Sequence, residues 1–281
     1  MPGYLTAGAG RLWSGTTDGV VAVDPATGGT TVVPDSGPSF EIGFGHDSVW
    51  TSSFEEGLIR RIDPATASVV ATIEIPGGPG NYAFTDDGVW VTLHRSGSVS
   101  RIDPATNQVV ATVHDVGQEG SGGPQSIAVV GAEIWVGVSN ISGVVRIDPA
   151  TAAIIDTIAI PSGATPCGGM LVTPAAVWMS SCAEQTSFTR IDRATNAAAV
   201  ITTDGYTSIP QLVGDTVWIV VSNEEAKALV GFDPATGEAG VSTPLEAAAY
   251  GTAVFADALW LTNFKTGILA RIAVSDLPVR G

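Results

Sequence analysis

The stretch Arg101–Val113, RIDPATNQVVATV, is one copy of a motif that recurs along the whole chain. The clear copies are 39 to 45 residues apart and are centred on Asp24, Asp63, Asp103, Asp148, Asp192 and Asp233. A worn seventh copy, Arg271-Ile272-Ala273, stands forty residues after the last clear one. A steady period of this length indicates a chain built from repeated supersecondary units.

The positions of the tryptophans give the same number of repeats independently of the Asp motif. They occur once per repeat, 11 to 15 residues before the Asp position, at Trp13, Trp50, Trp90, Trp135, Trp178, Trp218 and Trp260. Each lies in a short alternating run such as GVWVTLH, which is typical of a β-strand. We expect one bulky aromatic side chain per unit to fill the space between adjacent sheets, in preference to forming a cage for a cationic ligand.

Each repeat has room for four strands. In the fourth repeat these are SIAVV, EIWVGV, VVRID and IIDTIAI, at residues 126–130, 133–138, 144–148 and 154–160. Gly and Pro punctuate the chain, and no window has the apolar spacing of a packed helix. The sequence therefore predicts an all-β, seven-bladed β-propeller with four-stranded blades, a single domain over residues 1–281.

The Asp-Pro-Ala-Thr segments have the chemistry of turns. Pro fixes φ at about −65° in the second position, and the Asp and Thr oxygens can accept hydrogen bonds from nearby backbone N–H groups. A role for these carboxylates as ligands is the alternative. The turn chemistry favours a structural role.

Charge and hydropathy exclude several kinds of partner. The net charge is −16, because 28 acidic residues face 12 basic ones, of which only two are lysines. Such a chain would repel nucleic acid and anionic lipid surfaces. Charged residues or glycines interrupt every apolar stretch before the roughly 18 residues that a membrane span needs. The start, Met1-Pro2-Gly3-Tyr4, has neither the basic nor the apolar region of a signal peptide.

The stretch Val89–Val113, with VWV and SGSVSRIDPATNQVVATV, resembles the bacterial YVTN-type propellers and the related propellers that include streptogramin B (virginiamycin B) lyase. The resemblance covers essentially the whole chain and rests on the blade scaffold. It implies a seven-bladed fold, which lyases, sensors and cell-surface modules share. For the lyases it also implies a histidine base beside a Mg²⁺ ion held by carboxylates, and the opening of an ester by elimination.

The connections between strands point to one face of the propeller. The third-to-fourth strand turns are nearly constant, whereas the second-to-third strand loops read TTDG, FEEG, HRSG, NISG, CAEQTS, NEEAKA and FKTG. Variable loops on a constant scaffold mark the face that carries function. The candidate ligand-binding residues near its central mouth are Tyr4, Asn81, Tyr82, Gln125, Asn140, Gln211, Asn223, Tyr250 and Asn263.

We expect a non-enzymatic ligand-binding or interaction propeller whose site is this mouth. Acidic residues predominate in the variable loops, which favours a small-molecule, cationic or protein ligand. The alternative is a lyase-like or hydrolase-like enzyme in which His94 is the catalytic base and Glu55 and Glu224 hold a divalent metal, Mg²⁺ or Ca²⁺. Of the three histidines, His94 alone falls at the end of a second strand, and no paired His-x-Glu constellation accompanies it.

The two cysteines lie on neighbouring strands of the fifth repeat. In a hairpin centred on the turn at residues 173–176, Cys167 stands directly opposite Cys182. The Cβ atoms of such a pair are about 4.5–5.5 Å apart, which suits a disulfide. We expect this disulfide and, with it, an exported or extracellular protein. The alternative is a cytoplasmic protein in which reduced thiols pack as small apolar residues.

The last repeat is too short for a fourth strand. By analogy with Val109–Val113, its outer strand would run from Val279 to position 283, beyond Gly281. We therefore expect an incomplete seventh blade of three strands, with Ile268–Ile272 as an exposed edge that is a template for pairing with another chain. The same gap predicts that the natural protein extends beyond Met1 or Gly281.

Overall fold

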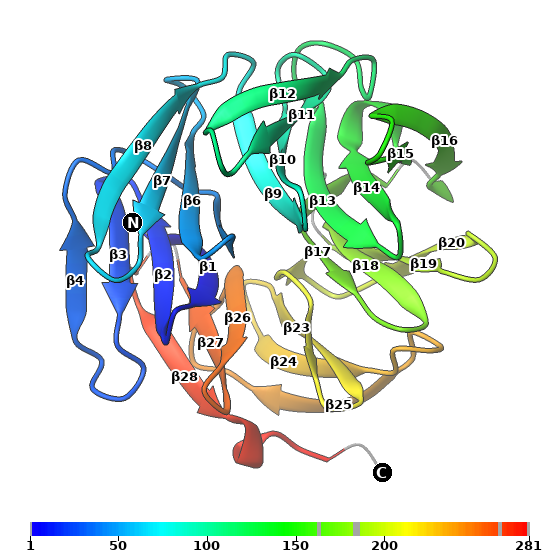
Figure 1. Ribbon diagram of the computed structural model, residues 1–281. Helices are drawn as coiled ribbons and strands as arrows, with labels where there is room; N and C mark the ends of the chain where they lie inside the picture. Colours follow the sequence, from blue (N-terminus) through cyan, green and yellow to red (C-terminus); the bar gives the residue numbers. More distant parts are fainter. Residues whose placement is uncertain (1, 162–163, 182–185, 264–265, 280–281) are drawn as a thin grey trace.

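Seven antiparallel β-sheets stand radially around a central axis in the computed structural model (Figure 1). The structure describes residues 2–161, 164–181, 186–263 and 266–279. Each sheet corresponds to one repeat of the sequence, with its first strand innermost and each following strand farther out. The prediction of an all-β, seven-bladed propeller is confirmed.

The first four blades are meanders of four strands. Blade 1 contains β1 (Pro2–Gly8), β2 (Arg11–Thr16), β3 (Gly19–Val23) and β4 (Thr30–Val33). Blade 2 contains β5 (Ile42–Gly45), β6 (Ser48–Ser53), β7 (Leu58–Asp63) and β8 (Ser68–Glu74). Blade 3 contains β9 (Pro79–Thr85), β10 (Gly88–Leu93), β11 (Ser98–Asp103) and β12 (Gln108–Val113). Blade 4 contains β13 (Pro124–Val130), β14 (Glu133–Val138), β15 (Gly143–Asp148) and β16 (Ala153–Ala159).

Blade 5 keeps this pattern, whereas blades 6 and 7 depart from it. Blade 5 contains β17 (Pro166–Val172), β18 (Ala176–Ser181), β19 (Ser187–Asp192) and β20 (Ala198–Thr202). Blade 6 has an inner strand in two pieces and contains β21 (Tyr206–Thr207), β22 (Gln211–Val213), β23 (Thr216–Ser222), β24 (Lys227–Phe232) and β25 (Ala239–Pro244). Blade 7 contains β26 (Gly251–Phe255), β27 (Ala258–Thr262) and β28 (Leu269–Ala273). Short 3₁₀ helices follow β14 and β28, as η1 (Ser139–Ile141) and η3 (Val274–Asp276). The described part of blade 7 therefore has the three strands that the sequence predicts.

The second strand of each blade is the centre of the core. Strands β6, β10 and β18 are buried along their whole length because neighbouring blades cover both of their faces. Trp50 is fully buried and packs with Val89 and Ile102 of the next blade. Trp260 packs with residues of blade 1, including Leu12, and so closes the ring. Tryptophans therefore fill the space between blades, as predicted.

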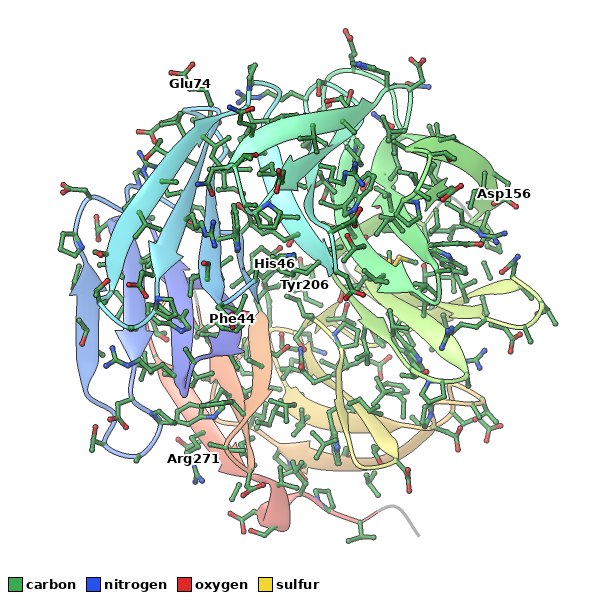
Figure 2. All side chains as sticks on the ribbon, in the orientation of Figure 1. Phe44, His46, Glu74, Asp156, Tyr206 and Arg271 are labelled. Atoms are coloured by element: carbon green, nitrogen blue, oxygen red, sulfur yellow. The ribbon has the colours of Figure 1, made fainter. Side chains whose placement is uncertain are left out.

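Polar and apolar side chains are both exposed on the outside of the ring, the apolar ones including Val32, Val110 and Ile155 of the outermost strands. Glu74, Asp156 and Arg271, which belong to the outermost strands of their blades, point away from the axis at the rim (Figure 2). The buried apolar side chains cluster between blades, and the third and fourth strands meet solvent on their outer side.

The Asp-Pro-Ala-Thr segments form turns between third and fourth strands. In blade 3, Asp103 accepts hydrogen bonds from the Ala105 backbone N–H at 2.8 Å and from the Thr106 hydroxyl at 2.9 Å. These bonds, the one from Ala105 first, hold the pKa of Asp103 below its usual value. Because each carboxylate is engaged by its own turn, the repeated Asp residues have a structural role.

Candidate functional site

Several inner strands are irregular where they begin, at the face that carries the variable loops. The ladders of β1, β9 and β13 each shift register near the start of the strand, at bulges that contain Tyr4, Asn81 and Gln125. A bulge breaks the alternation of side chains and re-aims one of them, and bulges are common beside binding sites. These three predicted residues are therefore placed toward the central mouth by local breaks in the repeat.

A cavity of ≈ 150 Å³ lies at this mouth, among blades 1 to 4. It is lined by Tyr4, Glu41, Phe54, Gly80, Asn81, Thr92, His94, Pro124 and Gln125. Four residues predicted from the sequence, Tyr4, Asn81, His94 and Gln125, thus meet in one place. Three other lining residues with functional side chains, Glu41, Phe54 and Thr92, were not predicted.

The repeat carries a signal that would have found Glu41. Tyr4, Glu41 and Asn81 each stand nine residues before the tryptophan of their blade. This position is occupied by a different chemical group in each of the first three blades, and all three groups line the cavity. A position that varies in a constant repeat, at the start of the inner strand, therefore marks the site.

Glu41 is the acidic residue of the cavity. It directly precedes β5, and its backbone carbonyl accepts a hydrogen bond from the Ser52 N–H at 3.2 Å. Loss of hydration raises the pKa of its partly buried carboxyl to about 7, and a hydrogen bond to its own backbone opposes the shift. None of the ion pairs within the described residues includes Glu41. The cavity therefore holds a poorly solvated carboxyl group with no ion-pair partner in the described part of the chain.

Three tyrosines lie within electrostatic reach of this carboxyl group. The rings of Tyr4 and Tyr250 are 5.8 Å apart at an angle of 45°, and the hydroxyl of Tyr82 hydrogen-bonds with that of Ser52. Burial raises the pKa of each phenol, and the negative charge of Glu41 raises it further. The phenols are therefore neutral around physiological pH and cannot compensate the charge of an ionised Glu41.

His94 joins the cavity to a long connection between blades 3 and 4. Its Nε2 accepts a hydrogen bond from the Gly122 N–H at 3.1 Å, and its ring meets Phe54 edge-on at 5.7 Å. Burial lowers the pKa of the imidazole, although a hydrogen bond with the Pro124 backbone acts in the opposite direction. His94 is therefore neutral at pH 7, and it is tied to the backbone of residues 122–124.

That connection, residues 114–123, is fastened at several points. The Gly117 N–H donates to the Gly97 carbonyl at 3.0 Å, and the Gly120 N–H donates to the Arg95 carbonyl at 2.9 Å. A Cβ on Gly123 would come within 2.0 Å of the His94 carbonyl oxygen, so this close approach requires glycine. The connection is therefore held against the loop that carries His94, Arg95 and Gly97.

The predicted asparagines at the ends of second strands have a different role. The side-chain amide of Asn140 donates to the Gln118 carbonyl at 2.8 Å, that of Asn223 to Asp204 at 2.7 Å and that of Asn263 to Ala248 at 2.5 Å. Each bond ties a variable loop to the connection that enters the same blade. Gln211 donates to the Thr252 hydroxyl at 3.0 Å. The structure places these four residues outside the cavity lining.

The two carboxylates proposed as metal ligands lie on exposed loops of blades 2 and 6. Glu55 is exposed and its carboxylate lies 2.7 Å from the Arg95 guanidinium, which in turn lies over the Phe54 ring at 4.4 Å. Glu224 is exposed on the connection between β23 and β24, in blade 6. Within the described residues no group of three His, Cys, Asp or Glu side chains is arranged to hold a metal ion.

The hairpin that contains Cys167 has a bulge that was not predicted from the sequence. The predicted register holds from Met170↔Met179 to Val172↔Val177. Two glycines, the first with φ +68°, then shift it, so that Cys167 pairs with Ser180. The premise of direct opposition to Cys182 is therefore wrong, because Gly168 and Gly169 interrupt the ladder. Cys182 lies outside the described residues, and the disulfide stays a prediction.

Solved structures with the same architecture extend over nearly the whole chain. Hydrazine synthase of Kuenenia stuttgartiensis has a TM-score of 0.79 at 13% identity, over 97% of this chain and 95% of that chain. A chain of the mitotic checkpoint complex has a TM-score of 0.78 at 11% identity, over 96% and 87%. BamB from Moraxella catarrhalis has a TM-score of 0.64 at 15% identity, over 95% and 84%. At these identities the likeness supports the propeller fold alone.

No protein-family model and no curated protein sequence matches this chain. No helix in the described residues is long and apolar enough to cross a membrane. The propeller fold is consistent with a binding or interaction role, and the chemistry of the site has to carry any finer statement.

Proposed function

We propose that the protein binds a small organic cation, such as an alkylammonium ion, in the cavity at the channel mouth. The observation that carries the proposal is Glu41, whose pKa is raised to about 7 by lost hydration and which has no described ion-pair partner. A bound cation would replace the missing hydration with a direct charge interaction. The net charge of −16 favours the approach of a cation.

The other walls of the cavity suit the same ligand. Tyr4 and Phe54 offer aromatic rings, which attract organic ammonium ions through their negatively charged faces. The volume of ≈ 150 Å³ is similar to that of a cavity known to take one benzene molecule, so the ligand has few non-hydrogen atoms. Asn81 and Gln125 add polar edges that would orient it.

We propose binding rather than catalysis because the groups needed for the enzymatic alternative are engaged elsewhere. The imidazole of His94 is held by Gly122 and the Pro124 backbone, and Glu55 is paired with Arg95. A general base needs an acceptor free to reach the substrate proton. These contacts favour a wall-forming role for His94.

Isothermal titration calorimetry tests the proposal with methylammonium and tetramethylammonium, and with tert-butanol as a neutral control. We expect the cations to bind and tert-butanol not to bind. Because a cation lowers the pKa of Glu41 from about 7, binding at pH 7 should release protons. The measured heat should then depend on the ionisation enthalpy of the buffer.

Two variants locate the site. Glu41→Gln should abolish cation binding and the proton release, because the amide has no charge to offer. Glu55→Gln is the matched control, since this carboxylate is exposed and outside the cavity lining, and it should bind as the parent does. Equal affinity of the Glu41→Gln variant and the parent would contradict the proposal.

We also propose that the chain is a divergent member of the YVTN-type and virginiamycin B lyase-like propellers, and that the protein is exported. The repeat motif at Val89–Val113 supports the first statement. The expected Cys167–Cys182 disulfide supports the second. Thiol counting on the unfolded, unreduced protein should find no free thiol, and two free thiols would remove the support for export.

A further inference from the structure

Blade 7 has no outer strand in the described residues. Its third strand, β28, pairs with β27 from Thr262↔Leu269 to Ala258↔Ala273, and no described strand pairs with its other side. In each of the other blades a fourth strand covers this position. A free edge presents unpaired N–H and C=O groups, which are a template for an added strand.

In complete blades the outer strand also fills the space between its blade and the next. Val113 and Val116, at and just beyond the end of β12, are buried in a cluster with residues of blade 4. The corresponding pairs in blades 2 and 4 are Ile73 with Ile75 and Ile158 with Ile160. The outer strand therefore supplies two β-branched apolar side chains to each of these interfaces.

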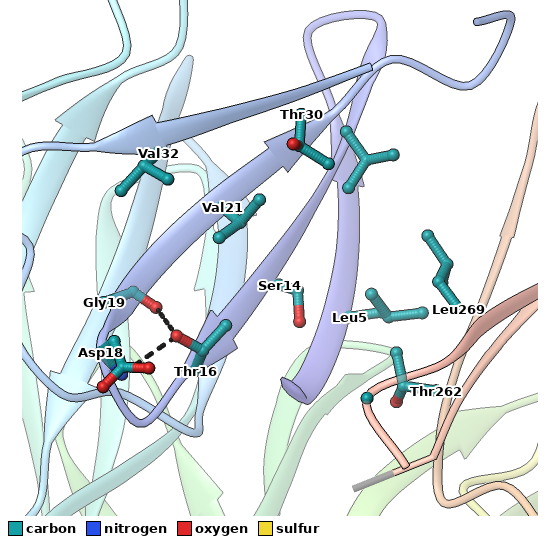
Figure 3. Close-up of a pocket in the computed structure, with 12 residues that line it drawn as sticks. Leu5, Ser14, Thr16, Asp18, Gly19, Val21, Thr30, Val32, Thr262 and Leu269 are labelled. Carbon is teal, nitrogen blue, oxygen red and sulfur yellow. Dashed lines mark hydrogen bonds between the residues drawn. The ribbon is translucent and has the colours of Figure 1, made fainter. Parts of the chain in front are cut away.

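Between blades 7 and 1 the same space is a cavity of ≈ 390 Å³ (Figure 3). Leu5 and Val21 line it from blade 1, and Leu269 and Thr262 line it from blade 7. The exposed surface of these walls is mostly apolar, although Asp18 and several hydroxyl side chains also line the cavity. The interiors between other blades are apolar too.

The repeat shows that this cavity is the empty counterpart of a filled interface. Val21 in blade 1 and Val145 in blade 4 occupy the same position, since each pairs with the residue that follows its blade's tryptophan. Leu5 and Ile127 also correspond, because each stands eight residues before that tryptophan. Val145 and Ile127 belong to the cluster that buries the two valines of blade 3. Two apolar side chains are therefore missing between blades 7 and 1.

We propose that β28 and this cavity bind an extended segment of another polypeptide, which adds as a fourth strand antiparallel to β28. Its backbone would pair with the edge, and two β-branched side chains at alternate positions would enter the cavity. The chain itself shows the fitting pattern at Thr72–Pro76, TIEIP, and Thr157–Pro161, TIAIP. This site is separate from the channel mouth and does not depend on the function proposed for it.

A second copy of the chain fits the edge less well than such a segment. Symmetrical pairing of two β28 strands about their middle residue would set two Arg271 guanidinium groups opposite each other, and directly opposed like charges destabilise a strand pair. The strand LARIA also lacks the two alternating β-branched residues that fill the interfaces of the complete blades. The edge therefore suits an extended strand of Ile-x-Ile type better than it suits a second β28.

Fluorescence anisotropy tests this with a labelled peptide of residues 67–77, ASVVATIEIPG. We expect saturable binding to the intact protein. A peptide with Asp in place of both isoleucines should bind at least about tenfold more weakly, because it would place charges in an apolar cavity. Hydrogen exchange should show slower exchange of the β28 amides when the peptide is bound.

Variants of the protein show whether peptide binding depends on the cavity itself. Val21→Phe places a ring in the cavity and should weaken peptide binding at least about tenfold, whereas the control Val110→Phe adds the same ring on the exposed outer strand of blade 3. Binding that is absent, or that is equal in both variants, would overturn the proposal. A concentration-dependent dimer that Val21→Phe abolishes would assign the edge to a second copy instead, and would overturn it too.

Discussion

The cavity at the channel mouth and the cavity between blades 7 and 1 arise from one repeat by opposite routes. At the mouth, blades 1 to 4 have all their strands, and bulges in the inner strands turn side chains such as Tyr4 and Asn81 inwards. Between blades 7 and 1 the described ladders of blade 7 are regular, and an outer strand is missing. The first cavity measures ≈ 150 Å³ and contains an ionisable group, Glu41, whereas the second measures ≈ 390 Å³ and is mainly apolar.

The difference explains why the two cavities suit different ligands. A bulge frees individual side chains, so its cavity acquires whatever functional groups those positions carry. A missing outer strand instead exposes side chains that are buried in the complete blades. The resulting cavity is therefore mainly apolar, and it has a free backbone edge. The first route suits a small charged molecule, and the second suits a length of polypeptide.

The largest effect is expected when side chains are removed from the filled interface between blades 3 and 4. Replacing Val113 and Val116 by alanine should recreate between blades 3 and 4 the space found between blades 7 and 1. Both side chains are buried, at 4% and 1% exposure, so the double variant should lose about 4 kcal/mol of unfolding free energy. Urea unfolding measures this as a lower midpoint with an unchanged slope.

Val21→Ala is the control for this double variant, because Val21 already borders a cavity. It should cost less than about 1 kcal/mol, since few contacts are lost there. A similar loss in both variants would mean that the two interfaces are equally well packed, and the comparison would fail.

The next largest effect concerns Glu41 and pH. The pKa of its carboxyl is about 7 in the folded protein, whereas an ordinary glutamate in the unfolded chain has a pKa of 4.5. Between these two pH values the folded state therefore holds a proton that the unfolded chain releases. The parent therefore loses stability as the pH rises from about 4.5 to 8. Glu41→Gln lacks this titration and should match the parent near pH 5. By pH 8 it should exceed the parent by about 2 kcal/mol, less than the full linkage value because water reaches the channel.

Chemical unfolding from pH 5 to pH 8 measures the two curves, with Glu55→Gln as the exposed control. Parallel curves for the parent and Glu41→Gln would show that the carboxyl is solvated in the folded protein. That result would also remove the contrast between a charged cavity and an apolar one.

The fold was predictable because its determinants repeat. The turn motif recurs in most blades and a tryptophan lies between blades at the same repeat position, so that the place of Trp50 between blades 2 and 3 predicts that of Trp260 between blades 7 and 1. Counting along the repeat also predicted the three strands of blade 7 and its edge, at Ile268–Ile272 against the observed Leu269–Ala273. One-residue differences of this kind are normal for strand ends.

The candidate site was only partly predictable because bulges and loop contacts do not repeat. Glu41 directly precedes its strand, where no motif of the sequence marked it, and Phe54 was read as a loop residue. The asparagines were read as pocket residues, but their amides bond to neighbouring backbone, as Asn140 does to Gln118. Such contacts depend on how a variable loop folds back, which periodicity does not encode.

A smaller effect is expected where the mouth is fastened to the connection before blade 4. His94→Ala leaves the Gly122 N–H without its acceptor and removes a ring that packs on Phe54. The variant should lose about 1 kcal/mol of unfolding free energy. Hydrogen exchange at Gly122 should become faster, whereas the β28 amides at the other cavity should not change. Faster exchange in both places would indicate a global rather than a local effect.

The smallest effect should come from filling the apolar cavity, and it has the opposite sign. Val21→Phe adds apolar volume to the cavity of ≈ 390 Å³ that Leu5 and Leu269 also line. Cavity filling of this kind should raise the unfolding free energy by about 0.5 kcal/mol, because the added ring gains contacts on surface that is already apolar. The same substitution at the filled counterpart, Val145→Phe, should be destabilising, since Val145 is 2% exposed and tightly packed. Thermal and urea unfolding measure the change in unfolding free energy of each variant. The two changes have opposite signs if one interface is empty and the other is filled, and the same sign if both interfaces are packed alike.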